Sequence, residues 1–384
     1  MKRRAQPAGS VNRFNGVTGR RCLSAALLLL LCPALAAGAE APAADPVRIA
    51  QASNATVGLM GGDAGSTDAR MAADIATVLD DADRLRVLPM LGVGSVQNIA
   101  DLIYLKGVDV AIVHADALAQ TKQMNAIPKE GSVQYIAKLY QEEIHILAAK
   151  NIAGLADLNG QAVNAGRTGS GTELTAGTLF KALHIDASFL HDTDSRALDR
   201  LRRNEIAAMV VVGGKPVPLL QTVPPGTGLH FLPIALNAEL VESFLPTSLD
   251  SQQYPSLVTI DHPVDTVAVG AVLITLATPA DSLRARRVNR FVDLLFDRFR
   301  QFGQPGFHPK WSEVSLFAQV PGWTRYPEAQ SRVNQQDQSL EASLRHAFDT
   351  YLSQTGQSIE GLDTARQQAL FQDFLRWRGK HAGP

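Results

Sequence analysis

The sequence predicts an α/β fold of two lobes, each built on a mixed and mostly parallel sheet, followed by a helical extension. Strand-like apolar runs alternate with segments of helical periodicity from about residue 47 to 310, the pattern of parallel sheets covered by helices. About ten strands are predicted, more than one compact sheet usually holds. Two of them, 135–149 and 265–277, are long and lie between blocks of strand–helix units.

The individual elements follow from the spacing of the apolar residues. In the segment 67–81, Met71, Ile75 and Val78 recur at helical spacing. The continuous apolar run of 108–113 is typical of a buried parallel strand. The same reasoning predicts further strands at 47–62, 85–91, 188–191, 207–212 and 229–234, a helical turn and strand at 155–166, and further helices at 96–105, 173–185, 194–206, 237–245 and 284–302.

The two long strands indicate where the chain crosses between lobes, because a chain that leaves one lobe and later returns needs such crossing strands. We therefore predict a discontinuous first lobe of residues 47–140 plus 265–325. The second lobe, residues 141–264, is inserted into it.

Residues 326–384 are predicted to form the helical extension. Its first segment has apolar residues every four positions, at Leu340, Leu344, Phe348 and Leu352. Its second segment has an apolar face made of Leu370, Phe371, Phe374, Leu375 and Trp377. Because an exposed face of that size promotes aggregation, we expect the two helices to pack back on the body. The alternative is an element that docks a partner protein.

Residues 1–39 have the features of a secretory signal peptide. The segment is basic, and Arg20 and Arg21 precede the apolar run 23–31, which is followed by small residues. That run is shorter than the roughly 20 residues that a membrane-spanning helix needs. We therefore expect export to a periplasm and cleavage, which would remove both cysteines of the chain.

The composition argues against several classes of protein. Of 384 residues, 46% are hydrophobic and 19% charged, which is typical of a globular chain. Beyond residue 39, 30 basic and 37 acidic residues give a net charge of −7, unlike a nucleic-acid-binding protein. The sequence lacks a phosphate-binding loop, a dinucleotide-binding run, HExxH and GxSxG. No catalytic residue, cofactor or metal site is therefore predicted.

The strongest local signal is the loop of residues 166–172, which follows a predicted strand and precedes a helix. Gly169 and Gly171 leave backbone N–H groups open, while Ser170 and Thr172 add hydroxyl donors. Together with the positive end of the helix, these groups suit a carboxylate or phosphate. A plain helix N-cap at Thr172 explains the same residues, and the loop composition does not decide between the two.

Three other loops follow strands in the same way, and the first two of them precede predicted helices. They offer Ser66 and Thr67, then Ser95 and Asn98, and then Asp116. In open α/β sheets, ligands bind outside the carboxyl ends of the strands, where helix N-termini point. Each loop alone is better explained by capping, but the set predicts a binding cleft.

Two single residues are further candidates for this cleft. Lys215 follows a strand end, where it fits a charge partner of an anionic ligand and an exposed turn lysine equally well. Tyr140 ends the apolar run of a crossing strand, where a tyrosine lines a cleft or packs in a core. Both choices stay open.

Five of these segments together resemble the TAXI family, the extracytoplasmic solute-binding proteins of TRAP-type transporters. The segments are 92–116, 136–180, 211–218, 252–258 and 264–275. The most specific part is the GSGT sequence at 169–172. The resemblance implies a two-lobed periplasmic-binding-protein type II fold. It also implies ligand contacts, with Tyr140 at the crossing, by Ser95, Asn98, Ser170, Gly171 and Thr172.

The resemblance implies that the protein captures a small carboxylate, a glutamate-like amino acid or a dicarboxylate, by hinge closure. A TRAP-type permease would be its partner. One departure is the loop 61–70, where the family carries aromatic residues and this chain has Ser66, Thr67 and Asp68, which indicates a more polar wall. The alternatives are a sensor that signals through the C-terminal helices and an enzyme on the same fold.

Overall fold

The computed structural model describes most of the chain, namely residues 55–81, 84–123, 127, 131–355 and 364–381. The predicted signal peptide, residues 1–39, lies outside the described residues. Within the described residues, no helix combines the length and the apolar character that a membrane span requires.

Ten strands of the described chain join into one mixed sheet. They are β1 (Thr56–Met60), β2 (Arg86–Met90), β3 (Val110–His114), β4 (Val133–Ala148), β5 (Ala162–Asn164), β6 (Ser188–Leu190), β7 (Ala208–Gly213), β8 (His230–Phe231), β9 (Leu245–Leu249) and β10 (Val264–Leu276). The order along the sheet is β2-β1-β3-β10-β4-β7-β5-β6, with β8 paired to β4 and β9 paired to β10. Strands β1, β2 and β3 are parallel and form the first strand group. Strands β5, β6 and β7 are parallel and form the second strand group.

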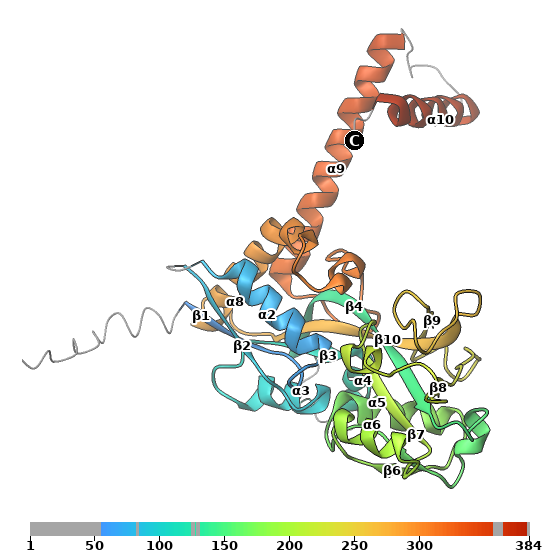
Figure 1. The fold of residues 1–384 in the computed structure, drawn as a ribbon. Coiled ribbons are helices and arrows are strands. Elements are labelled where there is room, and N and C mark those ends of the chain that lie inside the picture. The colour runs from blue at the N-terminus through green and yellow to red at the C-terminus, as the bar shows by residue number, and fades with distance from the viewer. Residues whose placement is uncertain (1–54, 82–83, 124–126, 128–130, 356–363, 382–384) are drawn as a thin grey trace, which may run out of the picture. The chain divides into compact units, whose positions relative to one another are not determined.

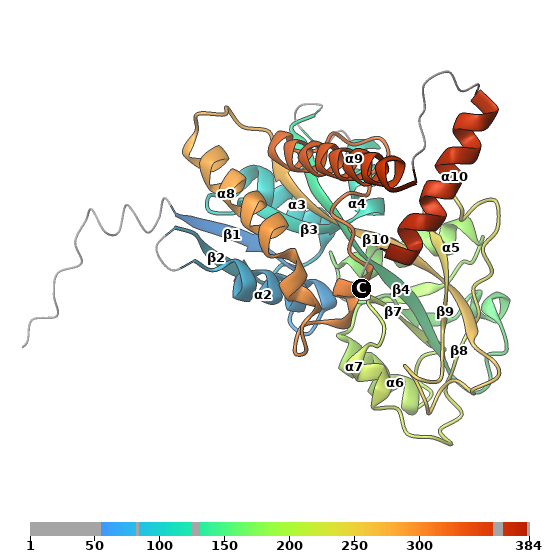
Figure 2. The same ribbon diagram turned by 90° about the horizontal axis from the view of Figure 1, so that it is seen from above.

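This single sheet corrects the prediction of two sheets. Strands β4 and β10 are the predicted crossing strands, and they pair antiparallel with each other. β10 also pairs with β3, and the distal half of β4 pairs with β7. The hydrogen-bond ladder therefore runs unbroken from one strand group to the other, as Figures 1 and 2 show. The predicted lobe boundaries remain a prediction.

Helices cover the two strand groups. They are α2 (Thr67–Leu79), α3 (Ser95–Tyr104), α4 (Ala115–Gln123), α5 (Gly171–Ala182), α6 (Asp194–Arg202), α7 (Pro218–Gln221) and α8 (Leu283–Arg298), with 3-10 turns η1 (Leu155–Leu158), η2 (Phe299–Gly303) and η3 (Pro309–Glu313). β3 sends Ile112 into a core shared with α2 and α8, and Val113 into a core shared with α3 and α4. Successive strand residues face opposite sides, which explains why the strand is apolar from Val110 to Val113. A third core joins α5 and α6 to β7.

The segment 237–245 differs from its predicted helix, because it forms turns that lead into β9. The Asn237 side chain accepts hydrogen bonds from the N–H groups of Glu239 and Leu240, which favours a turn. Pro246 then disfavours a helical conformation at the residue before it. In contrast, α4 was not predicted.

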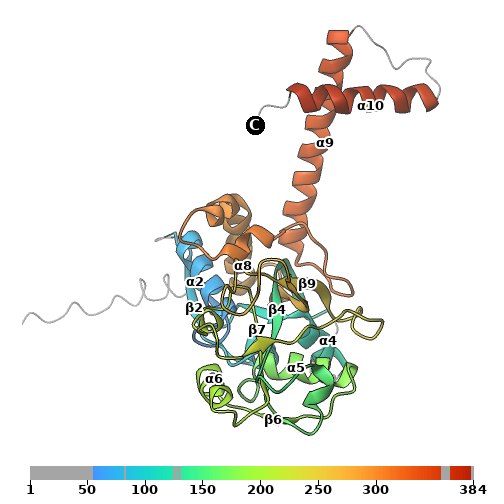
Figure 3. The same cartoon turned by 45° about the vertical axis from the view of Figure 1, so that its right-hand side comes forward.

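The tail forms two helices, α9 (Pro327–Thr355) and α10 (Thr364–His381). α9 contacts α8 at the body, and α10 contacts α9, as Figure 3 shows. Tyr351, Leu370 and Phe374 form a small core of their own with neighbouring apolar residues of the same two helices. Part of each apolar face therefore packs against the other helix, while Phe371 and Leu375 stay exposed. This packing of α10 on α9 corrects the expectation that both helices pack back on the body. The side chain of Leu340 lies outside the described residues.

We predict that Phe374→Ala detaches α10 without weakening the body. Phe374 is buried and makes an edge contact with Phe348 at a centroid distance of 5.1 Å. Truncating a buried phenylalanine costs about 3–5 kcal/mol, more than two packed helices can spare. Hydrogen–deuterium exchange should show α10 unprotected and β4 unchanged. The half-exposed Phe371 provides the control Phe371→Ala, and loss of protection in β4 would contradict a separate core.

Candidate functional site

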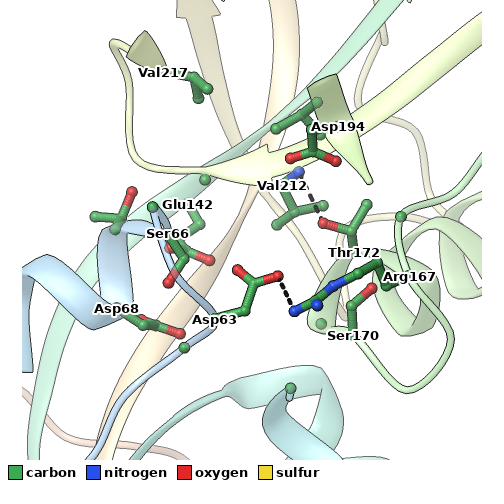
Figure 4. A pocket seen from close by; sticks show the side chains of 18 of the residues that line it. Asp63, Ser66, Asp68, Glu142, Arg167, Ser170, Thr172, Asp194, Val212 and Val217 are labelled. Carbon is green, nitrogen blue, oxygen red and sulfur yellow. Dashed lines mark hydrogen bonds and ion pairs between the residues drawn. The ribbon is translucent and has the colours of Figure 1, made fainter. Parts of the chain in front are cut away.

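A cavity of about 570 Å³ lies between residues of the two strand groups. The N-terminal ends of α2 and α3 line it from the first group, and those of α5 and α6 line it from the second. Each helix N-terminus carries a partial positive charge. Figure 4 shows side chains from both groups pointing toward one another across this space. The cavity is the described site in which the predicted loops meet.

Six of the predicted site residues line this cavity, namely Ser66, Thr67, Ser95, Ser170, Gly171 and Thr172. Ser66 caps α2 by accepting a hydrogen bond from the N–H of Ala69, and Ser170 caps α5 by accepting one from Glu173. The N-cap of α5 is therefore Ser170 and not Thr172. Whether these residues bind a ligand stays a prediction.

The other three hydroxyl groups hold neighbouring loops together. Thr67 accepts a hydrogen bond from the N–H of Gly214 at 3.0 Å, which connects α2 to the loop after β7. Ser95 accepts one from the N–H of His114, also at 3.0 Å. Thr172 accepts one from the N–H of Val212. These contacts fix the rim of the cavity and leave the hydroxyl protons available for a bound solute.

Three more predicted residues lie beside the cavity without lining it. Asn98 is buried and donates hydrogen bonds to the carbonyl oxygens of Gly61 and Ile112, so it clamps the loop after β1 to β3. Asp116 accepts a hydrogen bond from the Thr175 hydroxyl at 2.7 Å. The N–H of Gly169 is taken by the side chain of Glu173.

Tyr140 and Lys215 lie on opposite sides of β4, because successive residues of the strand face opposite ways. Tyr140 and Glu142 share the strand face toward the cavity, whereas Glu143 faces the other side. Lys215 lies on the same side as Glu143, because its Nζ lies 3.7 Å from that carboxylate. The same Nζ donates hydrogen bonds to the Thr247 hydroxyl and the Ser248 carbonyl. Lys215 therefore lines a separate cavity of about 250 Å³.

A cluster of three buried ionisable side chains lines the cavity, and the sequence did not predict it. Asp68 comes from α2, His114 from the end of β3, and Glu142 from β4. Nε2 of His114 lies 2.5 Å from a Glu142 oxygen and 3.8 Å from an Asp68 oxygen. Tyr140 lies behind them, where its hydroxyl donates to Asp68 and lies 3.5 Å from Glu142.

The environment of this cluster shifts its pKa values strongly. Burial, reinforced by the Glu142 carboxylate, raises the pKa of Asp68 to about 7. Burial by itself would lower the pKa of His114, but the Glu142 and Asp68 carboxylates outweigh it and raise that pKa to about 10. The two carboxylates therefore favour the protonated form of His114.

Further charged groups face the cavity from its rim. Arg167 pairs with Asp63 at 2.6 Å, and this ion pair joins the second strand group to the first (Figure 4). Burial raises the pKa of Asp194 to about 6, Asp63 adds to the rise, and Arg167 opposes it. The cavity thus has basic and acidic groups on facing walls.

The rims of the cavity touch each other through backbone. A Cβ atom on Gly94 would come within 2.3 Å of the carbonyl oxygen of Gly169. The Asp63–Arg167 pair and the Asp116–Thr175 hydrogen bond bridge the same two groups. The structure is therefore a closed arrangement in which both groups contact around the cavity.

Sequence signals for the missed cluster are weak but identifiable. His114 is the last residue of the buried strand β3, and Glu142 follows Tyr140 by two residues on the same strand face. Asp68 stands in the loop that differs from the resembling family. The pairing of β3, β10 and β4 brings His114 and Glu142 together, and α2 adds Asp68.

The chain belongs to the NMT1-like family, whose profile matches residues 62–317. Its structure is similar to the periplasmic binding protein BugD, with a TM-score of 0.46 and 12% identity over 75% of this chain and 96% of that chain. It is also similar to MatC from Rhodopseudomonas palustris with bound malate, with a TM-score of 0.41 and 15% identity over 73% and 97%. The effector-binding domain of QuiR in complex with shikimate gives a TM-score of 0.39 and 13% identity over 66% and 98%.

We predict opposite effects for two glycine substitutions in α5. A Cβ atom at position 171 would lie 2.7 Å from Cε1 of His114, whereas one at Gly177 meets nothing within 4 Å. Gly171→Ala should lower the free energy of unfolding by about 1–3 kcal/mol through overpacking. Gly177→Ala should raise it by about 0.5–1 kcal/mol, since alanine favours a helix interior. Urea denaturation measures both, and equal shifts would refute close packing of α5 on His114.

Proposed function

We propose that the protein is an exported solute-binding protein that captures a small carboxylate in the cavity between the strand groups. One observation carries this proposal: α2, α3, α5 and α6 all begin at the cavity, so four partial positive charges converge there. The hydroxyls of Ser66, Ser170 and Thr172 and the guanidinium of Arg167 add donors. This donor set supports binding of an anion.

The solute class follows from the resemblance to TAXI proteins together with this donor set. A glutamate-like amino acid or a dicarboxylate would place one carboxylate against the start of α5. Arg167 lines the cavity, and its side chain is nearly half exposed, so it would donate to that carboxylate as well as to Asp63. The protein would hold the solute without converting it.

Capture would proceed by closure of the two strand groups about β4 and β10. The ladder between these strands has register shifts near Gly270 and Leu273, where bending costs fewer regular hydrogen bonds. Contacts such as Asp63–Arg167 exist only in the closed arrangement, so a solute that adds contacts there shifts the population toward it. A TRAP-type permease in the membrane would then receive the solute.

A sensor that signals through α9 and α10 is the second candidate. Phe371 and Leu375 on α10 stay exposed although the two helices pack on each other. A partner protein would bind at these residues and respond to the solute-bound form of the protein.

We predict that Ser170→Ala with Thr172→Ala abolishes carboxylate binding and leaves the protein folded. L-glutamate, succinate and malate at millimolar concentration serve as probes, and a bound one raises the melting temperature of the wild type. Calorimetry should show a loss of affinity of about 100-fold or more in the double variant, since two hydrogen bonds to a charged group are lost at about 1.5–3 kcal/mol each.

The matched control is Arg203→Met, which removes a cation on the outer side of the second strand group, paired with Glu205. It should leave affinity unchanged, while Arg167→Met should weaken it. A double variant that binds the probe as tightly as the wild type would contradict the assignment of the α5 loop.

A further inference from the structure

The carboxylates of Asp68 and Glu142 meet at the imidazole of His114 in the cavity wall. We infer that these three side chains form a binding site for a divalent transition-metal ion of the zinc class. Within the described part of the chain, one ligand atom from each lies within 4.8 Å of the others. All three side chains are less than 10% exposed, and all three border the cavity.

The spacing of the ligand atoms fits a metal ion better than an ammonium group. Nε2 of His114 lies 2.5 Å from Glu142 and 3.8 Å from Asp68. A zinc ion with bonds of about 2.1 Å and tetrahedral angles holds its ligand atoms about 3.4 Å apart. An ammonium group with hydrogen bonds of about 2.8 Å needs acceptors about 4.6 Å apart. The separation from Asp68 lies near the first value, whereas the 2.5 Å contact with Glu142 is a direct hydrogen bond that a bound ion would widen by about 1 Å.

The types of ligand select the class of metal. One imidazole nitrogen and two carboxylates are ligands of zinc and its transition-metal neighbours, whereas calcium and magnesium prefer oxygen alone. Two carboxylates against one imidazole also leave negative charge in a buried place, which a divalent ion on Nε2 would compensate.

Tyr140 supports the same site from behind. Its hydroxyl donates a hydrogen bond to Asp68 and lies 3.5 Å from Glu142, so it orients both carboxylates. Partners of this kind are characteristic of metal sites, where they hold the ligands in position. Tyr140 is itself fully buried and acts here as a positioning residue.

A second carboxylate cluster, on the opposite face of β4, differs from the cavity cluster in the cation that it holds. Glu143 and Glu313 hold the ammonium group of Lys310 at 2.7 Å each, so this cluster carries its own cation. The cluster in the cavity has a histidine in that place, and histidine can release its proton to a metal. The two faces of one strand therefore differ in which cation they accept.

Three protein ligands leave a coordination position open, as in zinc sites that bind a water or a substrate. The site borders the cavity, so a carboxylate solute would reach this position. Nδ1 of His114 is buried and has no hydrogen-bond partner within the described residues, so only Nε2 faces the two carboxylates as a ligand atom. The binding of a solute at the open position rests on the proposed function, whereas the metal site itself rests on the three side chains alone.

The test is a metal titration of the full chain after treatment with a chelator. Calorimetry with zinc chloride and visible spectra with cobalt chloride should both give one bound ion per chain. Asp68→Asn, His114→Gln and Glu142→Gln should each weaken zinc binding by about 100-fold or more, and Tyr140→Phe by about 10-fold. Asp194→Asn is the matched control, because it removes another acidic group of the same cavity and should leave affinity unchanged.

X-ray absorption of the wild-type zinc complex keeps the test valid where a variant fails to fold. One imidazole and oxygen ligands at about 2.0–2.2 Å are expected. A sulfur shell would assign the ion to Cys22 or Cys32 and overturn the proposal, as would the absence of stoichiometric binding or an equal loss in Asp194→Asn. Zinc binding that survives in the Ser170→Ala and Thr172→Ala variant supports the metal site whether or not carboxylates bind.

Discussion

The antiparallel pairing of β4 with β10 is the constraint on which the rest of the structure depends. These two strands are hydrogen-bonded to each other and to one strand of each parallel group, so they decide where both groups lie. The cavity exists because helices that follow strands of both groups begin near this pair. A shift of β4 by one residue would exchange its two faces and move Glu142 out of the cavity.

The two faces of β4 each carry a buried carboxylate with a different cationic partner. Glu142 faces the cavity and meets His114, while Glu143 faces the other way and meets Lys310. Each of these two buried carboxylates therefore has a partner of opposite charge, as buried charged groups require. The partners differ in chemistry, since a lysine ammonium group offers no acceptor to a metal ion, whereas a histidine can exchange its proton for one. The face of β4 toward the cavity is thus the one whose cation can be exchanged.

The sequence predicted the elements better than their assembly. The long strands and most helices were predictable because apolar spacing depends on local periodicity, as in α2 and β3. The turn at Asn237 was missed because a side-chain hydrogen bond overrode helical spacing. The loops of Ser66, Ser95 and Ser170 were found from their position after strands. Asp68, His114 and Glu142 were missed as a cluster because they lie far apart in sequence, and Lys215 belongs to the other face of the sheet.

The contact of Gly94 with the loop at Gly169 has a consequence for the two rims of the cavity. The two loops meet backbone to backbone, so there is no room for a side chain between them at position 94. Any side chain at position 94 would act as a wedge between them. A single methyl group there would hold the two strand groups apart while every other residue that lines the cavity stayed unaltered, and the open form could then be studied in isolation.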